Sequence, residues 1–249
     1  MTRVATIPAE GDQLCEGCGY VLNGLPAGSR CPECGKPADE SSPALRHPPA
    51  WELPERPGRP LAAFLRTTAE LLFRPARFFR TLTPAVQTAQ GARSVSFARI
   101  HWALAAVLLG SAAWAHTDWY ITLGGKRQFE VFRQVPLLVG AWVAAYVFLV
   151  VLTHVAARLT TLEAGYRGLR LPLQTVLRGL HYHAAHYLPV GVLAAGTVLG
   201  YQFALWRGWA GGTSGAAYLY VLSAEVVVAA GYLFSTYWTA MRNLMYANR

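Results

Sequence analysis

Residues 187–205 carry no charged side chain, and this uncharged stretch limits the fold more than any other feature of the sequence. Since a helix rises about 1.5 Å per residue, the stretch covers most of the roughly 30 Å hydrocarbon core of a bilayer. A buried helix of a soluble protein is the alternative for a single such run. Three further runs, at residues 97–115, 135–156 and 217–238, favour membrane-spanning helices for all four.

The composition indicates the same class of fold. The chain is 53% hydrophobic and 14% charged, whereas a soluble domain has about 25% charged residues. Tryptophan and tyrosine fall at the ends of several apolar runs, where amphipathic rings settle at a membrane interface. Small residues recur inside the runs and allow helices to approach closely in lipid. We therefore expect an all-α membrane protein whose residues 97–249 form a four-helix transmembrane bundle, with an amphipathic surface helix and a small N-terminal module.

The formal net charge of +9 is compatible with binding to nucleic acid or to anionic lipid headgroups. Because the arginines flank the apolar runs, we expect contact with lipid headgroups and no nucleic acid. Most Lys and Arg lie on the side of the bundle that holds both chain ends, and only Lys126, Arg127, Arg133 and Arg207 lie on the other. The positive-inside rule then places both termini in the cytoplasm, and we expect a bacterial inner membrane. The first forty residues hold no apolar signal-peptide region, so the first span would act as the insertion signal.

The four cysteines form two C-x-x-C-G pairs, Cys15 with Cys18 and Cys31 with Cys34. This spacing is typical of a tetrahedral site in which four thiolates bind one Zn²⁺. The glycine after each pair permits the left-handed backbone that such a turn requires. Four protein ligands leave no open position, so the zinc would be structural. It would supply the folding free energy that about 25 residues cannot obtain from a core.

Two alternatives stay open for the cysteines. A rubredoxin-like iron site uses similar pairs, but it needs a longer, aromatic-rich insert than residues 20–30, which hold one aromatic residue. A thioredoxin-type redox pair would need a βαβ pattern around it. Residues 18–26, CGYVLNGLP, resemble the short zinc ribbons that bacterial membrane proteins often carry at the N-terminus. The resemblance implies a zinc ribbon of β-knuckles at residues 1–40, which stabilises the chain or docks a cytoplasmic protein.

The sequence changes character twice before the first apolar run. Residues 41–60 contain six prolines, which forbid a regular helix and predict a semi-extended tether that lets the ribbon move. Residues 61–96 begin with arginines among Leu and Phe, as in a helix that lies in the headgroup plane. A helix packed inside the bundle is the alternative. Pro75 would divide this stretch into two short helices, and the polar residues 87–96 predict a loop.

Residues 118–132, between the first two runs, contain two short β-type segments on either side of Gly124 and Gly125. This pattern predicts a hairpin that caps the outer face of the bundle. A first helix that continues to Leu123 is the alternative.

Glu225 is the one acidic residue that lies well inside an apolar run. A carboxyl group in hydrocarbon is costly, so Glu225 is a candidate for binding a proton or a cation. Its expected partners are His101, His154 or a tyrosine. A purely structural bond between helices is the alternative.

Three histidines, His181, His183 and His186, directly precede the third run. His183 and His186 lie three residues apart and would share a helix face, so they are candidate metal ligands. No nearby carboxylate completes a facial triad, and the H-E-x-x-H motif is absent. We therefore expect interfacial residues here, and we expect no catalytic residues in the chain.

Residues 72–84 combine prolines and phenylalanines before the first run, and Tyr187, Leu188 and Pro189 open the third. In these features residues 70–240 resemble the Yip-type membrane domain, whose eukaryotic members interact with Rab GTPases. That family usually has five spans, and four are counted here. The resemblance implies a non-enzymatic integral membrane protein that acts in membrane organisation or partner recruitment.

Two other functions stay open: a small transporter or channel component that uses Glu225, and a membrane enzyme that uses the three histidines. The expected partners are the lipid bilayer and a cytoplasmic protein bound through the ribbon, with a homo-oligomer as a further alternative. Zn²⁺ is the expected cofactor.

Overall fold

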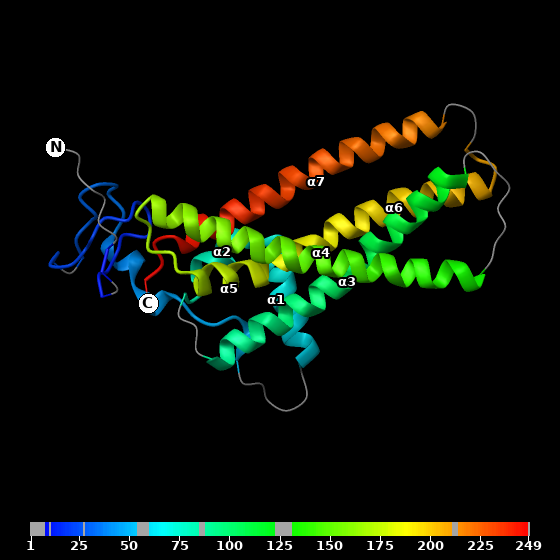
Figure 1. The fold of residues 1–249 in the computed structure, drawn as a ribbon. Helices are drawn as coiled ribbons and strands as arrows, with labels where there is room; N and C mark the ends of the chain where they lie inside the picture. Colours follow the sequence, from blue (N-terminus) through cyan, green and yellow to red (C-terminus); the bar gives the residue numbers. More distant parts are fainter. Residues whose placement is uncertain are drawn as a thin grey trace. The chain divides into compact units, whose positions relative to one another are not determined.

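The computed structural model describes residues 8–9, 11–26, 28–53, 60–84, 88–122, 131–210 and 214–248, and its long elements are all helices. The α-helices are α1 (Pro60–Phe73), α2 (Pro75–Thr81), α3 (Thr88–Thr122), α4 (Val131–Tyr166), α5 (Leu173–His183), α6 (Tyr187–Trp206) and α7 (Ser214–Leu244), as Figure 1 shows. Short 3₁₀ helices are η1 (Ala38–Ser41), η2 (Pro43–Leu45), η3 (Ala50–Glu52) and η4 (Ala184–His186). As Pro75 predicts, α1 and α2 are separate helices.

Within the described residues, four segments are long and apolar enough to cross a membrane, which indicates a membrane protein. They are Gly91–Tyr120, Gln134–Tyr166, Leu173–Trp206 and Gly215–Leu244. Each is longer than the run that the sequence predicts, because the helices continue past the apolar residues into polar ones. The count of four agrees with the prediction, and the compartment and orientation stay predictions.

The predicted loop at residues 87–96 is wrong, because α3 already begins at Thr88. Its polar side chains find partners inside the helix. The Ser96 hydroxyl donates to the carbonyl of Ala92 at 3.0 Å, and the Ser94 hydroxyl donates to that of Gly91 at 2.9 Å. These bonds satisfy the hydroxyls within the helix, so the two serines are compatible with α3 at these positions.

The predicted hairpin is also wrong over its first segment, where Asp118 to Thr122 belong to α3. Trp119 keeps this part helical, because its ring packs edge-on against Tyr201 at 5.8 Å and Tyr218 at 5.0 Å between ring centroids. The central residues 123–130 lie outside the described part of the chain. The alternative of a longer first helix is the one that fits the described residues.

The third candidate span consists of two helices with a short interruption. α5 is amphipathic and buries several polar side chains, whereas α6 is apolar. The 20 residues of α6 extend about 30 Å, the thickness of the hydrocarbon core. η4 separates the two helices, and Pro189 accounts for the interruption because it has no N–H to donate to the preceding turn.

The chain divides into two compact units. The first comprises Met1–Ala98, Thr153–Ala185 and Thr236–Arg249, and the second comprises Arg99–Leu152 and His186–Ser235. The core of the first unit gathers aromatic and aliphatic side chains from α1 to α5 and from the end of α7, including Phe79, Phe97, Tyr182 and Leu244.

The proline-rich segment belongs to this first core, so the prediction of a free tether is wrong for the part that is described. The Trp51 ring in η3 packs against Phe64 and Phe97, with centroids 5.6 and 6.3 Å away. Ser41 and Glu52 are buried. Prolines forbid a long helix here, but they allow 3₁₀ turns whose side chains pack on the helices. Residues 54–59 lie outside the described part.

In the second unit, two of the small residues in the apolar runs allow close helix contacts. A Cβ on Gly110 would lie 2.8 Å from the carbonyl oxygen of Ala141, and a Cβ on Gly191 would lie 3.0 Å from the Cβ of Leu108. The nearby Trp142 indole donates to the Ser111 hydroxyl at 2.9 Å. Such close approach is how helices associate in lipid.

Candidate metal centre and its polar surroundings

The two cysteine pairs form two turns of the same geometry. In each, the N–H of the first cysteine donates across the turn, from Cys15 to the Tyr20 carbonyl and from Cys31 to the Lys36 carbonyl, both at 2.8 Å. The glycine after each pair, Gly19 or Gly35, has a φ of 82° or 73°. This left-handed backbone is the reason that glycine is needed there.

The four sulfur atoms lie within 4.8 Å of one another. The Sγ atoms of Cys15 and Cys34 are 3.4 Å apart, and those of Cys18 and Cys31 are 3.6 Å apart. A disulfide would need about 2.05 Å. Four ligands about 2.3 Å from one metal ion would be about 3.8 Å from one another in a tetrahedron, so the cysteines fit a metal ion.

The expected β-strands of a ribbon are not found in the part of the chain that the structure describes. Only isolated bridges pair Leu14 with Val21 and Arg30 with Pro37. The four cysteines with these two turns are named here the cysteine knot. Leu22 and two of the cysteines form its small buried core.

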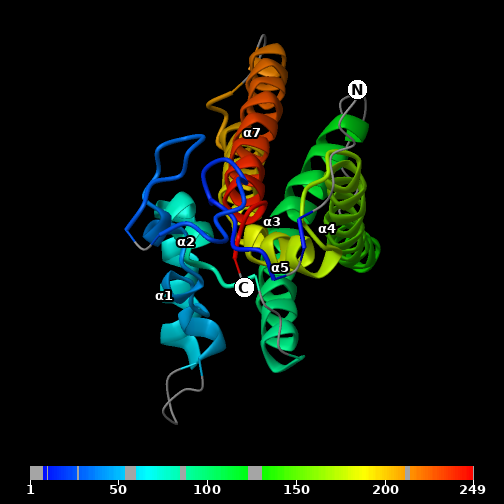
Figure 2. The ribbon, with the colours of Figure 1, turned by 90° about the vertical axis from the view of Figure 1, so that its left-hand side faces the viewer.

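The cysteine knot is held against the C-terminal end of the chain, which lies beside it in Figure 1 and Figure 2. The Asn248 side chain accepts from the Leu14 N–H at 2.8 Å and donates to the Leu14 carbonyl at 2.7 Å. Its second N–H donates to the Ser41 carbonyl at 2.7 Å. The amide thus pairs with the backbone as a neighbouring strand would, and Asn248 is buried.

A second contact joins the knot to the same C-terminal segment. A Cβ on Gly19 would lie 2.5 Å from Cε1 of Tyr246, so the tyrosine ring packs directly on the turn after Cys18. Any side chain at position 19 would displace this ring. Gly19 therefore has two reasons to be glycine, a positive φ and the space that the ring occupies.

Arg46 forms a third contact and is buried by it. Its Nε donates to the Glu16 carboxylate at 2.6 Å. Its Nη1 and Nη2 donate to backbone carbonyls that end two helices, Leu82 after α2 at 2.8 Å and Asn243 in α7 at 3.0 Å. Carbonyls at helix ends lack partners in their own helix and favour a cation. One guanidinium therefore joins the knot to α2 and α7.

The first unit also contains a buried ion pair. The Glu52 carboxylate accepts from Nη2 of Arg178 at 2.6 Å, and the Tyr182 hydroxyl donates to its other oxygen. The side chains of the pair are 0% and 2% exposed. Arg178 and Tyr182 are one turn apart on α5, so both reach the same acid. Burial raises the pKa of Glu52, and the Arg178 charge opposes this shift.

The three histidines do not gather around a metal site. His181 Nδ1 lies 3.3 Å from the Ser94 hydroxyl, and His183 Nε2 lies 2.9 Å from the Thr236 hydroxyl. In the second unit, His186 Nδ1 lies 2.7 Å from the Tyr232 hydroxyl. Among the described residues, the cysteines are the only group of three or more potential ligands close enough to share a metal ion.

Glu225 is partly buried in the second unit and accepts a hydrogen bond from the Thr197 hydroxyl of α6. This bond matches the alternative of a structural link between helices, and no bond from Glu225 to His101, His154 or a tyrosine is found among the described residues. The second carboxylate oxygen has no hydrogen-bond partner among the described residues. Glu225 therefore joins α6 to α7 with one oxygen and keeps the other unsatisfied.

Sequence reasoning missed the residues that hold the cysteine knot in place. Arg46 and Glu52 lie in the segment whose prolines suggest a tether, and Asn248 is one of several polar residues between positions 242 and 249. Arg178 gives no signal either, because it lies on the face of α5 opposite the leucines of that helix, where the sequence does not indicate a need for a buried partner. Nothing in the sequence identifies that partner as Glu52.

No protein-family model matches the sequence, no curated protein matches it, and no solved structure matches the fold. The resemblance of residues 70–240 to Yip-type domains therefore gains no support from a family match.

Proposed function

We propose that this chain is a non-enzymatic integral membrane protein whose cysteine knot binds a structural Zn²⁺ and presents a cytoplasmic surface to a protein partner. The observation that carries the proposal is the convergence of four sulfur atoms in a module that Arg46 and Asn248 attach to the helix ends. A module held this firmly can transmit a bound partner's position to the helices.

The donor set supports zinc among the metals. Four thiolate ligands in a closed tetrahedral set are typical of structural zinc, whereas a catalytic zinc keeps one position open for water or substrate. When bound, the ion would be held by Cys15, Cys18, Cys31 and Cys34, and would supply folding free energy and no reaction step. An iron site is the alternative that the metal content distinguishes.

Two exposed apolar residues on the knot support a docking role. Tyr20 is 41% exposed and Val21 is 38% exposed, and both lie in the turn that follows Cys18. A tyrosine on a rigid turn is a frequent anchor of a protein interface. The arginine distribution along the sequence supports a cytoplasmic position for this surface.

The experiment combines metal analysis with partner capture from membranes. We expect one zinc per chain in the purified protein, and its loss in Cys34→Ser. A Tyr20→Ser and Val21→Thr double variant should keep its zinc and its melting temperature but lose the captured protein. A chain that binds iron, or a captured protein that stays with the double variant, would contradict the proposal.

The unsatisfied oxygen of Glu225 favours a second candidate function, a transporter or channel component with a proton or cation site in the membrane. In that case Glu225→Gln would abolish ion-linked flux in proteoliposomes and leave the zinc content unchanged. The docking role would be favoured if the wild type shows no measurable flux and Glu225→Gln captures the partner normally.

A further inference from the structure

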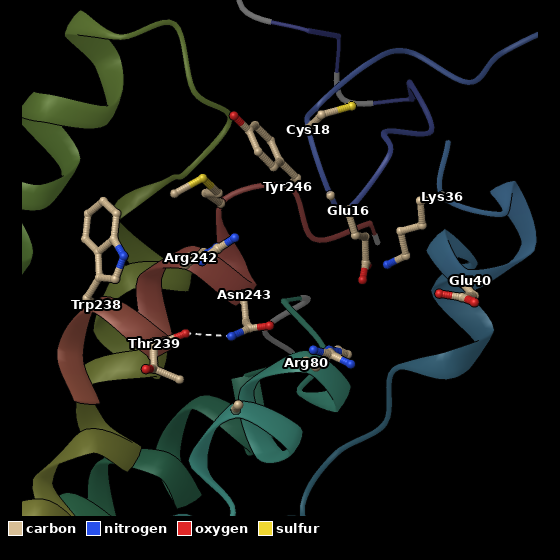
Figure 3. A pocket seen from close by; sticks show the side chains of 13 residues that line it. Glu16, Cys18, Lys36, Glu40, Arg80, Trp238, Thr239, Arg242, Asn243 and Tyr246 are labelled. Carbon is tan, nitrogen blue, oxygen red and sulfur yellow. Dashed lines mark hydrogen bonds between the residues drawn. The ribbon is translucent and has the colours of Figure 1, made fainter. Parts of the chain in front are cut away.

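A pocket of about 740 Å³ lies in the first unit between the cysteine knot, α2 and the C-terminal end of α7 (Figure 3). This volume falls within the range of roughly 300–1,000 Å³ that small-molecule sites have. Arg80 enters from α2, Arg242 and Trp238 from α7, and Lys36 from the knot, as Figure 3 shows.

Three cationic side chains line this pocket. Lys36, Arg80 and Arg242 line it, and none of the three forms an ion pair within the described part of the chain. One lining acid, Glu16, is already bound to Arg46 at 2.6 Å. Glu40 remains as the opposing acid. Cys18 also lines the pocket, and four thiolates around one Zn²⁺ would give that wall a net negative charge. Lys36 packs on the same wall, so Arg80 and Arg242 are the cations that the helices offer to an anionic ligand.

The pocket opens where the apolar part of α7 ends. Trp238 is the last residue of the apolar run, it lines the pocket, and it is 48% exposed. Tryptophan at the end of a span sits at the level of the lipid headgroups. α1, also in the first unit, exposes Phe73, Leu65 and Leu61, as a helix in the membrane interface would.

We propose that this pocket binds the headgroup of an anionic phospholipid, with Arg80 and Arg242 on its phosphate and Trp238 beside its glycerol. Basic pockets beside transmembrane helices recognise such headgroups. Lys36 has a second task, since its Cδ would lie 3.6 Å from a Cβ on Gly17 and the lysine thus packs on the knot. The two arginines therefore carry the recognition. The inference rests on membrane insertion and is independent of a partner at Tyr20.

The test uses the full, zinc-loaded chain in zwitterionic detergent and brominated phosphatidylglycerol, which quenches the fluorescence of a tryptophan that it contacts. The quenching signal of Trp238 is the difference between the wild type and Trp238→Phe. We expect it to saturate, and to need about thirtyfold more lipid in the Arg80→Gln and Arg242→Gln double variant, since each basic residue contributes about a fivefold preference.

A matched control removes the same charge elsewhere. Arg66 and Arg167 form exposed ion pairs with Glu70 and Glu163, so the Arg66→Gln and Arg167→Gln double variant should change the affinity by less than about twofold. Each single variant, Arg80→Gln or Arg242→Gln, should weaken binding about fivefold. The zinc content of every variant checks that the knot is folded.

Three results would overturn the inference. Brominated phosphatidylcholine could quench as strongly as phosphatidylglycerol, the arginine variants could bind like the wild type, or inorganic phosphate could displace the lipid at equal concentration. The last result would assign the pocket to free phosphate. The Tyr20→Ser and Val21→Thr variant should bind the lipid normally, so failure of the partner-docking function leaves this test unaffected.

Discussion

Asn248 uses its side-chain amide to hydrogen bond both the N–H and the carbonyl of Leu14, at 2.8 and 2.7 Å. This pair joins the C-terminal segment to the residue just before the first metal-ligand cysteine. The cysteine knot is thereby part of the first compact unit and does not hang on a tether. Binding of a metal ion, the end of α7 and the turn at Gly19 should therefore depend on one another.

The first prediction concerns Asn248. Asn248→Ala leaves the N–H of Leu14 and two carbonyls without partners in a buried place, so it should destabilise the knot by at least about 2 kcal/mol. Hydrogen exchange should then speed up over residues 11–26. Asn243→Ala is the control, because that side chain only donates to the Thr239 carbonyl in its own helix. Unchanged exchange in Asn248→Ala would show that the contact is dispensable.

The second prediction compares two glycines of similar backbone, Gly19 with φ 82° and Gly24 with φ 78°. Alanine costs about 1–2 kcal/mol at either position because of the left-handed backbone. Gly19→Ala should lower the melting temperature more than Gly24→Ala. A Cβ at position 19 would clash with the Tyr246 ring, whereas nothing lies within 4 Å of a Cβ on Gly24. Adding Tyr246→Ala should recover part of the extra loss. Equal losses at the two glycines would contradict the ring contact.

The third prediction compares two ion pairs in the first unit. Glu52→Ala leaves the buried charge of Arg178 uncompensated and should cost about 3–5 kcal/mol of unfolding free energy. The pair of Glu163 and Arg167 has the same 2.6 Å separation but side chains 57% and 60% exposed, so Glu163→Ala should cost less than about 1 kcal/mol. Tryptophan fluorescence during denaturation in detergent measures both. Similar losses would mean that Glu52 is not buried in the membrane protein.

The fourth prediction tests the proposed topology. Arg207→Cys and Arg167→Cys each introduce an exposed thiol at opposite ends of the candidate spans, and the native cysteines would be bound to metal. A membrane-impermeant maleimide should label position 207 in intact cells and position 167 only after lysis. The wild-type chain corrects for labelling of the native cysteines. Labelling in the reverse order would place the cysteine knot outside the cytoplasm.

Some local features of the sequence were reliable, whereas the polar residues 87–96 and the proline-rich segment predicted the wrong structure. The four apolar runs and the paired cysteines each identify themselves, because hydrophobic length and ligand spacing are properties of short segments. The helix break at Pro75 belongs to the same class. The boundaries of α3 could not be predicted in this way, since the Trp119 ring packs on Tyr201 and Tyr218 and the Ser94 hydroxyl lies 3.3 Å from Nδ1 of His181.

The sequence alone determined that this chain has four segments long and apolar enough to cross a membrane, and that four thiols can meet at one ion. Only the tertiary structure decided where the cysteine knot is held. Arg46, Glu52 and Asn248 find partners up to 234 residues away. Such partners cannot be inferred from residue type, because a buried cation or amide is stable beside any group that satisfies it, and the packing of the helices selects which group that is.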